Sequence, residues 1–328
     1  MKKLLITRVV AQPVLDQAAE LFDLTIRGDG SGMSEDECAV ALIAYDAILP
    51  TLGDQFTAGA FQKAQAGGLR CRMLGNFGVG YNHIDAAAAA AAGVIVSNTP
   101  DVLTAATADI GMTLILSTCR RASEGERMLR AGKWGGFGPK SMLGTEVSGK
   151  TLGIVGLGRI GSEVAVRAHA FGMTVVSFDP YIADERFTAL RVRRTATLDA
   201  LIGESNILTM HVPLNDETRG MIGKRELGRL PARSIVVNMA RGGIIDEPAL
   251  LAALDADQLR GAVLDVFTAE PLATDSPLRT APNLLLTPHL GANTVEAQRN
   301  VSRDVCLAVR DALLHNDLSK SINVAGGA

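Results

Sequence analysis

Residues 150–180 read KTLGIVGLGRIGSEVAVRAHAFGMTVVSFDP, and this stretch decides the fold. A short apolar run, TLGIV, leads into three glycines spaced G-x-G-x-x-G, at Gly156, Gly158 and Gly161. Apolar residues then recur at helical spacing, and a second apolar run, TVVSF, ends at Asp179. A buried strand, a tight turn, a helix and a second strand in this order predict a βαβ unit of a parallel sheet.

Each glycine of this turn has its own physical role. Gly156 permits the tight turn, Gly158 lets a ligand approach the backbone closely, and Gly161 lets the helix pack on the strand. Free N–H groups at the start of the helix, around Arg159 and Ile160, attract phosphate groups together with the helix dipole. Because strand and helix flank the glycines, the pattern predicts a dinucleotide-binding turn rather than an ordinary glycine-rich loop.

Asp179 indicates which dinucleotide is favoured. It ends the strand that follows the glycine turn, where a carboxylate accepts hydrogen bonds from ribose hydroxyls and repels a 2′-phosphate. The next residues are Pro180 and Tyr181 rather than arginine. We therefore expect NAD(H) as the cofactor. NADP(H) is not excluded, because Arg186 lies a short distance downstream.

The rest of the chain predicts two domains, because 328 residues exceed what one hydrophobic core usually holds. Before residue 98, apolar runs alternate with helical segments and predict a small α/β domain. From Thr151 onward a stronger alternation predicts a second, doubly wound parallel sheet. The strand candidates are LLITRVV, YDAILP, residues 73–77 and VIVSN in the first domain, and TLGIVGLG, TVVSFDP, SNILTMHVPL, RSIVVNMARGG, GAVLDVF and NLLLTPH in the second.

Three helical segments are also predicted from the sequence. Seven alanines, 86–92, are followed by Gly93 and predict a short helix. Residues 100–131 predict one long helical stretch, and residues 293–315 predict an amphipathic helix that returns to the first domain. We therefore expect a discontinuous first domain, 1–98 plus 291–328, with a second domain at 99–290.

Composition excludes several classes of partner. A net charge of −3 and the absence of a Lys/Arg cluster argue against nucleic acid. No apolar run is long enough to cross a bilayer, and Arg8 interrupts the apolar stretch that opens the chain, so we expect neither membrane span nor secretory signal. Four scattered cysteines without metal-binding spacing predict no metal site, no disulfides and a cytoplasmic location.

Charged residues follow three of the later strands. Arg241 stands in VVNMARGGIIDE, Glu270 in LDVFTAEP and His289 in LTPHLGAN. Each alone has a plain structural explanation as a surface arginine, a turn glutamate or a backbone-bonded histidine. Together they place a cation, an acid and a titratable base where an open α/β sheet binds its ligand. Such a set is suited to moving a hydride and a proton.

These blocks resemble the D-2-hydroxyacid dehydrogenase family. The resemblance rests on GLGRIG, NMARGGIIDE, LDVFTAEP and TPHLG, and extends over essentially the whole chain to NFGVGYNHID and NTPDVLTAATADIG. The last block, with AGKWGGFGPKSMLGTEVSGKTLGIVGLGRIG, is most similar to the glyoxylate and hydroxypyruvate reductase branch. The resemblance implies a Rossmann NAD-binding domain inserted into a flavodoxin-like substrate domain.

It also implies roles for single residues. His289 donates a proton to the carbonyl of a small 2-oxo acid while NADH donates hydride, and Glu270 holds the imidazole. Arg241 binds the substrate carboxylate and polarises the carbonyl, for which a forked, permanently charged guanidinium is suited. Asp265 meets the nicotinamide carboxamide. The further cofactor positions that the resemblance implies are Thr107, His211, Pro213, Thr218, Met239, Ala240 and Gly291.

On the substrate side, the backbone N–H groups of Gly78, Val79 and Gly80 clasp the carboxylate in proteins of this family, although a plain turn is the alternative. Leu52 lies near the substrate side chain. In the reductase branch, a tryptophan at the position of Trp134 reaches across a homodimer to the neighbouring active site. Anchoring in the protein's own core is the alternative for Trp134.

Four other functions compete. Phosphoglycerate dehydrogenase shares these blocks, but its usual regulatory extension is missing from this sequence, and a phosphorylated substrate requires cations that only Arg70 and Arg72 supply nearby. Formate dehydrogenase is disfavoured because its family pattern has a glutamine at the position of the catalytic glutamate, whereas this sequence has the acidic Glu270 there. A nonenzymatic NAD-sensing binding protein stays open, as do other D-2-hydroxyacid dehydrogenases.

Overall fold

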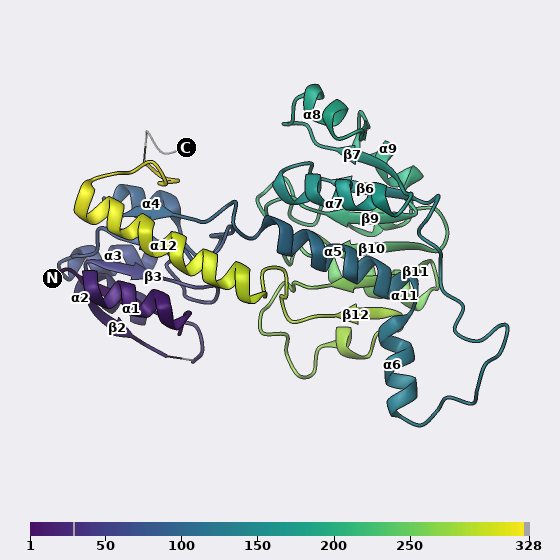
Figure 1. The fold of residues 1–328 in the computed structure, drawn as a ribbon, viewed down its shortest axis with the longest axis horizontal. Helices are drawn as coiled ribbons and strands as arrows, with labels where there is room; N and C mark the ends of the chain where they lie inside the picture. The colour runs from purple at the N-terminus through teal and green to yellow at the C-terminus, as the bar shows by residue number, and fades with distance from the viewer. Residues whose placement is uncertain (29, 325–328) are drawn as a thin grey trace. The chain divides into compact units, whose positions relative to one another are not determined.

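The computed structural model describes residues 1–28 and 30–324, and the chain forms two compact units (Figure 1). One unit is Met1–Leu103 with Asn293–Ala328, and the other is Thr104–Ala292. These boundaries lie within a few residues of the expected 98/99 and 290/291. Residues 325–328, which were assigned to the discontinuous domain from sequence, lie outside the described residues.

In the first unit, the described residues form a five-stranded parallel sheet in the order β2-β1-β3-β4-β5. This order is that of a flavodoxin-like doubly wound sheet, in which ligands bind at the carboxyl ends of the strands. The strands are β1 Lys3–Ile6, β2 Asp23–Ile26, β3 Ala47–Leu49, β4 Met73–Gly75 and β5 Ile95–Ser97.

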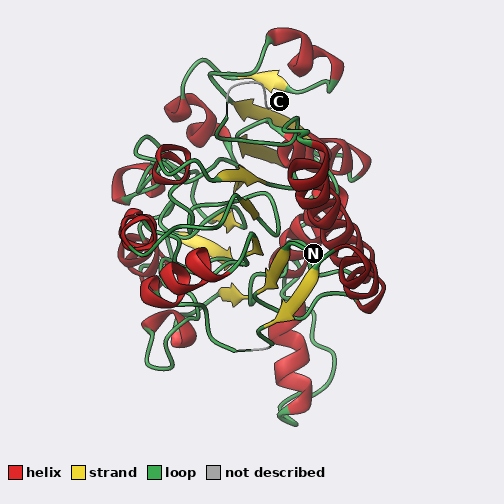
Figure 2. Ribbon diagram, turned by 90° about the vertical axis from the view of Figure 1, so that its left-hand side faces the viewer, coloured by secondary structure: helices red, strands yellow, loops and turns green. Residues whose placement is uncertain are grey.

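Helices cover both faces of this sheet, which lies between them (Figure 2). They are α1 Gln12–Leu21, α2 Glu35–Ala44, α3 Ala58–Ala66, α4 Ala86–Ala91 and α12 Val295–His315. The alanine-rich helix is confirmed as α4, with Asp85 capping it by accepting the Ala88 N–H at 2.8 Å. The return of the last helix to the first unit is also confirmed, because Val305 and Val309 of α12 pack on Gly75.

In the second unit, the described chain forms a seven-stranded parallel sheet in the order β12-β11-β10-β9-β6-β7-β8. The order reverses between β9 and β6, so the turns after these two strands flank the crevice in which a Rossmann sheet binds its ligand. The strands are β6 Thr151–Val155, β7 Thr174–Phe178, β8 Arg193–Arg194, β9 Ile207–Met210, β10 Ser234–Asn238, β11 Leu259–Leu264 and β12 Leu284–Leu286.

Two hydrophobic clusters enclose this second sheet. One contains the buried residues of α5 and α7, and the other those of α9, α10 and α11. The helices are α5 Thr104–Cys119, α6 Ala122–Arg130, α7 Arg159–Ala170, α8 Asp184–Ala189, α9 Leu198–Glu204, α10 Lys224–Leu227 and α11 Glu247–Asp255. The prediction of two doubly wound parallel-sheet domains is therefore confirmed.

The long helical stretch predicted at 100–131 is wrong as a single element. It consists of α5 and α6, with Arg121 between them in the left-handed region at φ 54°. The chain returns at Gly144 so closely that a Cβ there would lie 2.5 Å from the carbonyl oxygen of Cys119. The Thr145 N–H donates to that carbonyl, which ends α5. No residue of α6 is buried.

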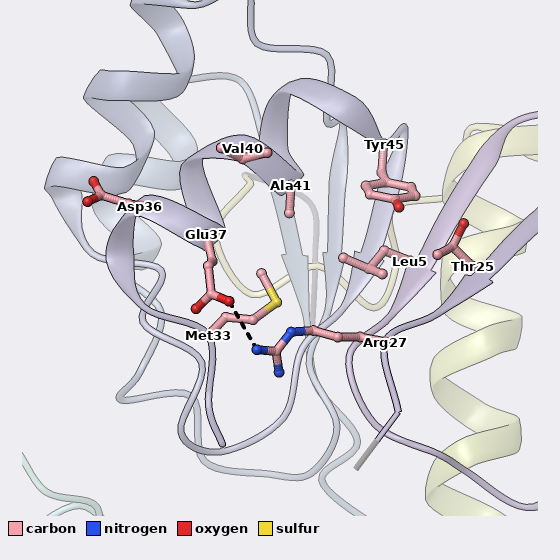
Figure 3. A pocket seen from close by; sticks show the side chains of 9 residues that line it. All are labelled: Leu5, Thr25, Arg27, Met33, Asp36, Glu37, Val40, Ala41 and Tyr45. Carbon is pink, nitrogen blue, oxygen red and sulfur yellow. Dashed lines mark hydrogen bonds and ion pairs between the residues drawn. The ribbon is translucent and has the colours of Figure 1, made fainter. Parts of the chain in front are cut away.

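A groove with a volume of about 410 Å³ opens in the first unit beside α2 (Figure 3). It is spanned by an ion pair between Arg27 and Glu37 at 3.1 Å. Its lining residues are Leu5, Thr25, Arg27, Met33, Asp36, Glu37, Val40, Ala41 and Tyr45. None of the site residues predicted from sequence lies here. Among the helices of the described ranges, none has the length and apolar character needed to cross a membrane.

Candidate active site

The glycine turn after β6 has the geometry of a phosphate-binding turn. Gly156 has φ +91°, and a Cβ there would lie 2.7 Å from the carbonyl oxygen of His211. A Cβ at Gly161 would lie 2.1 Å from the carbonyl oxygen of Gly156. A Cβ at Gly158, by contrast, would meet nothing within 4 Å. The backbone before α7 is therefore open to a ligand, whereas the other two glycines are required for packing.

Asp179 is nine-tenths buried and bonded directly to this turn. Its carboxylate accepts the Leu157 N–H at 2.8 Å and the Tyr181 N–H at 2.9 Å. The side chain is therefore held beside the glycine turn, at the end of β7. Arg186, whose position left NADP(H) open, donates to Ser162 Oγ at 2.9 and 3.1 Å.

The turn after β9 forms the other side of the crevice. Thr218 Oγ1 donates to the carbonyl of Pro213 at 2.6 Å and closes this loop. His211 Nε2 lies 3.0 Å from Thr209 Oγ1. Burial lowers the pKa of His211 to about 4, so the imidazole is neutral at neutral pH.

Four other predicted cofactor positions are packed against neighbouring helices or turns. Thr107 is buried in α5, and a Cβ at Gly291 would lie 3.6 Å from Thr107 Cγ2. Met239 is buried, and its sulfur fills the space beside Gly111. The Ala240 N–H donates to Asn238 Oδ1 at 3.1 Å.

His289 and Glu270 form a pair. Nδ1 of His289 lies 2.9 Å from Oε2 of Glu270, and the two side chains are 28% and 35% exposed. Because a carboxylate only accepts, Nδ1 carries the hydrogen and donates it. Within the described part of the chain, Nε2 has no hydrogen-bond partner. That nitrogen is the one available to exchange a proton with a ligand.

The electrostatics of Glu270 keep it ionised. Burial alone would raise the pKa of Glu270, but hydrogen bonds from His289 and from the Phe267 N–H, at 3.0 Å, act in the opposite direction. The positive charges of His289 and Arg241 add to this effect. The net result is a pKa below the usual value of 4.5, so Glu270 is a carboxylate at neutral pH.

Asp265 holds the backbone on which His289 stands. Its buried carboxylate accepts Thr287 Oγ1–H at 2.7 Å, the Leu290 N–H at 2.8 Å and the Gly291 N–H at 3.1 Å. The main-chain carbonyl of Asp265 accepts the His289 N–H at 2.9 Å. His289 has φ +53°, a conformation that costs an L-residue about 1–2 kcal/mol. These bonds stabilise that conformation. The carboxamide contact that the resemblance implies for Asp265 stays a prediction.

Arg241 follows β10 in a turn that Asn238 closes, since Asn238 Nδ2 donates to the Arg241 carbonyl at 2.8 Å. The guanidinium donates to the carbonyl of Ala240 at 2.6 Å, and among the described residues it has no carboxylate partner. Burial lowers the pKa of Arg241, and the charge of Glu270 opposes this. A guanidinium stays charged at neutral pH, so Arg241 offers an unpaired cation to an anionic ligand.

Sheet order explains why these residues meet. Strands β10, β11 and β12 are adjacent and parallel, so Arg241, Asp265 and His289 all follow the same edge of the sheet. A Cβ at Gly242 would lie 1.9 Å from the carbonyl oxygen of Phe267, which shows how closely the first two turns pack.

In the first unit, the Gly78–Gly80 loop follows β4. Asn76 Nδ2 donates to the carbonyls of Gly78 and Gly80 at 3.0 and 3.2 Å, and Asn98 Nδ2 donates to that of Val79 at 2.8 Å. Nothing in the described chain accepts the N–H groups of these three residues. Carbonyls that are bonded inward and N–H groups that are left unpaired form a concave anion-binding turn.

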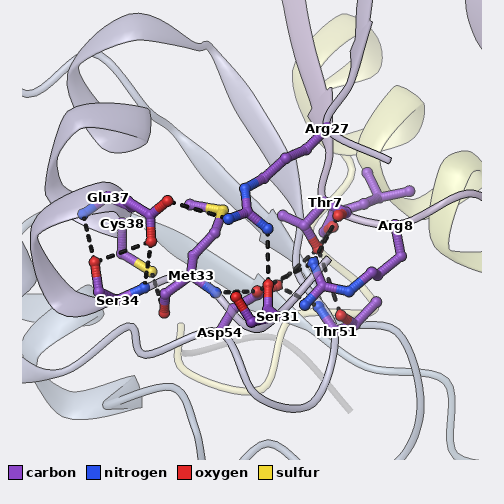
Figure 4. A network of polar contacts seen from close by, with 11 residues as sticks. Thr7, Arg8, Arg27, Ser31, Met33, Ser34, Glu37, Cys38, Thr51 and Asp54 are labelled. Atoms are coloured by element: carbon purple, nitrogen blue, oxygen red, sulfur yellow. Dashed lines mark hydrogen bonds and ion pairs between the residues drawn. The ribbon is translucent and has the colours of Figure 1, made fainter. Parts of the chain in front are cut away.

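A buried carboxylate also orders the neighbouring turns (Figure 4). Asp54 accepts Thr7 Oγ1–H at 2.7 Å, the Thr51 N–H at 2.9 Å and the Met33 N–H at 2.9 Å. The Arg8 guanidinium lies 3.7 Å from the same carboxylate. These contacts fix the turns after β1 and β3 and leave Leu52, which follows Thr51, 43% exposed.

The expectation that Arg70 and Arg72 lie near this loop is wrong. Arg70 donates to both oxygens of Asp46, at 3.0 and 2.9 Å, and Arg72 N–H donates to the Asp46 carbonyl. Asp46 directly precedes β3, and Arg70 and Arg72 lie just before β4, whereas the Gly78–Gly80 loop follows β4. Because the strands are parallel, the two arginines lie at the opposite edge of the sheet.

Trp134 is 59% exposed, so it does not anchor a core within its own chain. Phe137 and Leu143, in the same segment after α6, are 93% and 58% exposed. Among His, Cys, Asp and Glu side chains of the described residues, no group of three could hold a metal ion.

Several residues of the site were not found from sequence. Asn76 follows β4 and Asn98 follows β5, and an asparagine beside a glycine loop is a usable signal. Asp54 gave no signal, because two of its partners, Thr7 and Met33, lie on other turns and are brought close only by the fold.

A parallel sheet with a glycine turn, an acidic strand end and a His–Glu pair defines a dinucleotide-binding α/β protein. Residues 112–291, more than half of the chain, match the family model described as D-isomer specific 2-hydroxyacid dehydrogenase, NAD binding domain. The chain therefore belongs to the D-isomer specific 2-hydroxyacid dehydrogenase family, and its second unit contains the family's NAD-binding domain.

The relatives of this chain are named for different activities. The chain is 36% identical to a D-3-phosphoglycerate dehydrogenase of Synechocystis sp., over 99% of this chain and 57% of that protein. It is also 36% identical to a glyoxylate reductase of Korarchaeum cryptofilum, over 92% and 90%. A glyoxylate reductase structure from Paecilomyes thermophila superposes with a TM-score of 0.84 at 29% identity, over 98% of each chain.

The lengths of these relatives differ from that of this chain. It spans only 54–59% of three D-3-phosphoglycerate dehydrogenases that it matches.

Proposed function

We propose that this protein reduces a small 2-oxo acid of the glyoxylate or hydroxypyruvate type to the 2-hydroxy acid with NADH. The single observation that carries the proposal is the 2.9 Å contact between His289 and Glu270 on the edge of the NAD-binding sheet. NADH, which the glycine turn and Asp179 would hold, would supply the hydride for the carbonyl carbon, and the proton on Nε2 of His289 passes to the carbonyl oxygen. The products are NAD⁺, the hydroxy acid and neutral His289, which takes a proton back from water.

The other residues bind and orient the substrate. Arg241 supplies a charge for the substrate carboxylate and polarises the carbonyl, which its lack of a carboxylate partner supports. The N–H groups of Gly78–Gly80 bind a carboxylate, which their lack of acceptors supports. Asp265 acts through the backbone of His289 and is a positioning residue.

The first unit favours an unphosphorylated substrate over phosphoglycerate. At the carboxyl ends of the strands, Arg8 after β1 is paired with the buried Asp54 at 3.7 Å, and Arg27 after β2 is paired with Glu37 at 3.1 Å. Leu52, in the turn after β3, is an exposed apolar side chain at the same edge of the sheet. A phosphate group binds best to unpaired cations, and this edge offers an apolar contact instead.

We also propose a homodimer. The segment from α6 to residue 149 exposes Leu129, Trp134, Phe137 and Leu143, which are 58–93% exposed in the monomer. Apolar side chains gathered on one protruding segment are typical of a protein interface. A second copy is the proposed occupant, with Trp134 closing the partner's substrate site, as the family resemblance implies.

Sedimentation equilibrium tests the dimer. Phe137→Asp should shift the protein toward the monomer, whereas Tyr181→Asp, at an exposed aromatic outside this segment, should leave the wild-type mass unchanged. A monomeric wild-type protein would contradict the proposal.

The reaction is assigned to the cytoplasm, because the four cysteines are free and buried. Disulfides are expected in oxidising compartments and are rare in reducing ones.

The decisive experiment is a substrate panel. Initial rates are measured with glyoxylate, hydroxypyruvate, pyruvate, phenylpyruvate and 3-phosphohydroxypyruvate, each with NADH and with NADPH. We expect the highest kcat/KM with NADH and either glyoxylate or hydroxypyruvate. Highest activity with 3-phosphohydroxypyruvate would identify a phosphoglycerate dehydrogenase. NADH binding without turnover of any substrate would identify a binding protein.

A further inference from the structure

One hydrogen bond joins the two loops that flank the glycine turn. Tyr181 Oη, in the loop after β7, donates to Glu217 Oε2, in the loop after β9, at 2.6 Å. Strands β7 and β9 lie on either side of β6 in the sheet. The bond therefore spans the crevice at the place where the adenosine end of a dinucleotide lies in this fold.

Tyr181 connects Glu217 to Asp179. The Tyr181 N–H donates to Asp179 Oδ1 at 2.9 Å, while its hydroxyl reaches Glu217. The hydrogen bond to Glu217, then the charge of Glu217, and finally the charge of Asp179 all raise the pKa of Tyr181. Both carboxylates thus lie close enough to act on the same phenol.

Two arginines on the β7 side of the crevice, Arg194 and Arg186, have hydrogen-bond partners of their own. Arg194 pairs with Asp184 and also donates to the Asp179 carbonyl at 3.1 Å. Arg186 is directed at Ser162 Oγ on α7. Of the arginines near the ribose end, Arg194 is paired with a carboxylate, whereas Arg186 bonds only a hydroxyl and the exposed Arg219 has no carboxylate partner in the described chain. The case for Glu217 therefore rests on the contacts that Asp179 and Glu217 both make with Tyr181.

We propose that Glu217 is a second determinant of the preference for NAD(H) over NADP(H), because Tyr181 bonds the carboxylates of both Glu217 and Asp179. A 2′-phosphate, with a charge near −2, would then meet two carboxylates instead of one. The inference rests on the proposed placement of the adenosine ribose at Asp179. Under this proposal, cofactor selection depends on Glu217, in the loop after β9, as well as on Asp179 at the end of β7.

A purely structural role is the alternative, in which the bond only fastens two loops. That role affects both cofactors equally, because NADH and NADPH share the adenosine ring. Charge repulsion affects NADPH alone. The ratio of the two dissociation constants therefore separates the alternatives.

The test titrates NADH and NADPH onto the full-length protein and follows nicotinamide fluorescence. Glu217→Gln keeps the size and a hydrogen-bond acceptor but removes the charge. We expect the NADPH dissociation constant to fall about five-fold, equivalent to about 1 kcal/mol, while that of NADH changes less than about two-fold. Asp216→Asn is the matched control, because Asp216 is the exposed neighbouring carboxylate and has no partner in the described chain; it should leave the ratio unchanged.

Two further measurements sharpen the test. Tyr181→Phe should release Glu217 and improve NADPH binding by less than Glu217→Gln does. Raising the salt concentration should shrink the Glu217 effect, because exposed charges are screened.

Equal changes for both cofactors, or equal ratios in Glu217→Gln and Asp216→Asn, would overturn the proposal. An unchanged NADPH affinity in Tyr181→Phe would overturn the holding role of Tyr181. Failure of the wild-type protein to bind either cofactor would instead refute the proposed function, so the two failures are distinguishable.

Discussion

The two sheets end in turns of opposite chemical character. After β4 of the first unit, Gly78–Gly80 present backbone N–H groups, and the ordering side chains Asn76 and Asn98 are neutral. After β10 to β12 of the second unit, the turns present ionisable side chains, Arg241 and His289. One edge is suited to holding an anion, and the other to moving a proton.

The loops at both edges are nevertheless stabilised in the same way. A buried polar side chain bonds several backbone groups of the loop that follows the strand, as Asn76 does in the first unit and Asp265 in the second. Such loops are fixed before a ligand arrives, which reduces the cost of binding and orienting it. The comparison predicts that side-chain substitutions at the second edge abolish proton transfer. At the first edge, anion binding should instead be weakened by strain added to the backbone.

The largest effect is expected for His289→Gln. Loss of the proton donor should lower kcat about 1000-fold, which lies within the usual range for general acid catalysis, while NADH binding stays near wild type. The measurement is steady-state NADH oxidation with glyoxylate, alongside a cofactor titration. His315→Gln, at an exposed histidine of α12, is the control and should retain wild-type turnover. Turnover within about three-fold of wild type in His289→Gln would remove this residue from the mechanism.

Arg241→Gln should come next. Because the guanidinium both binds the carboxylate and polarises the carbonyl, KM should rise and kcat should fall, with kcat/KM reduced about 100-fold. Arg241→Lys should recover only part of this loss, since lysine keeps the charge but not the forked geometry. A rise in KM with unchanged kcat would show that Arg241 contributes binding alone.

Gly78→Ala tests the backbone edge. Gly78 has φ +117°, so a Cβ there is strained and should distort the loop. We expect KM for glyoxylate to rise about ten-fold with kcat nearly unchanged, the pattern of lost ground-state and transition-state binding alike.

Gly68→Ala is the matched control, because Gly68 has φ +91° with open space around it, away from this loop. It should lower stability by a similar amount, about 1–2 kcal/mol, and leave KM unchanged. Equal KM values in the two variants would argue against an anion-binding loop.

The smallest effect is the pH dependence of stability that Glu270 contributes. Folding lowers the pKa of Glu270 below 4.5, so the ionised form stabilises the folded state. This contribution is complete above about pH 4.5 and is lost as the pH falls through the lower folded-state value. The difference in unfolding free energy between wild type and Glu270→Gln, from urea titrations, should therefore be larger at about pH 7 than at about pH 3. A difference that grows toward acid pH would contradict this sign.

Sequence predicted the fold wherever strands are continuous apolar runs. The strand at Asp23–Ile26 was missed because it lies at the sheet edge and is mostly exposed, and Arg193–Arg194 because two arginines have no apolar pattern. The break at Arg121 was missed because no glycine or proline marks it. In each case, pairing or packing with distant residues decides the structure.

The site was predicted to the extent that it depends on motifs. The glycine turn and the charged strand ends are local patterns, and in the structure Nδ1 of His289 lies 2.9 Å from Oε2 of Glu270. The bonds of Asp265 and the Tyr181–Glu217 contact join residues more than 20 positions apart on different loops. Only strand order brings such residues together, and sequence spacing does not reveal it.

The central claim is that Glu270 acts through His289, and a double-mutant cycle on kcat/KM tests it most directly. Glyoxylate reduction is measured for wild type, Glu270→Gln, His289→Gln and the double variant, with NADH binding confirmed in each. We predict that Glu270→Gln slows the wild-type protein at least ten-fold but leaves the His289→Gln background unchanged. Effects that multiply in the double variant would show that the two side chains act independently, which would contradict the account.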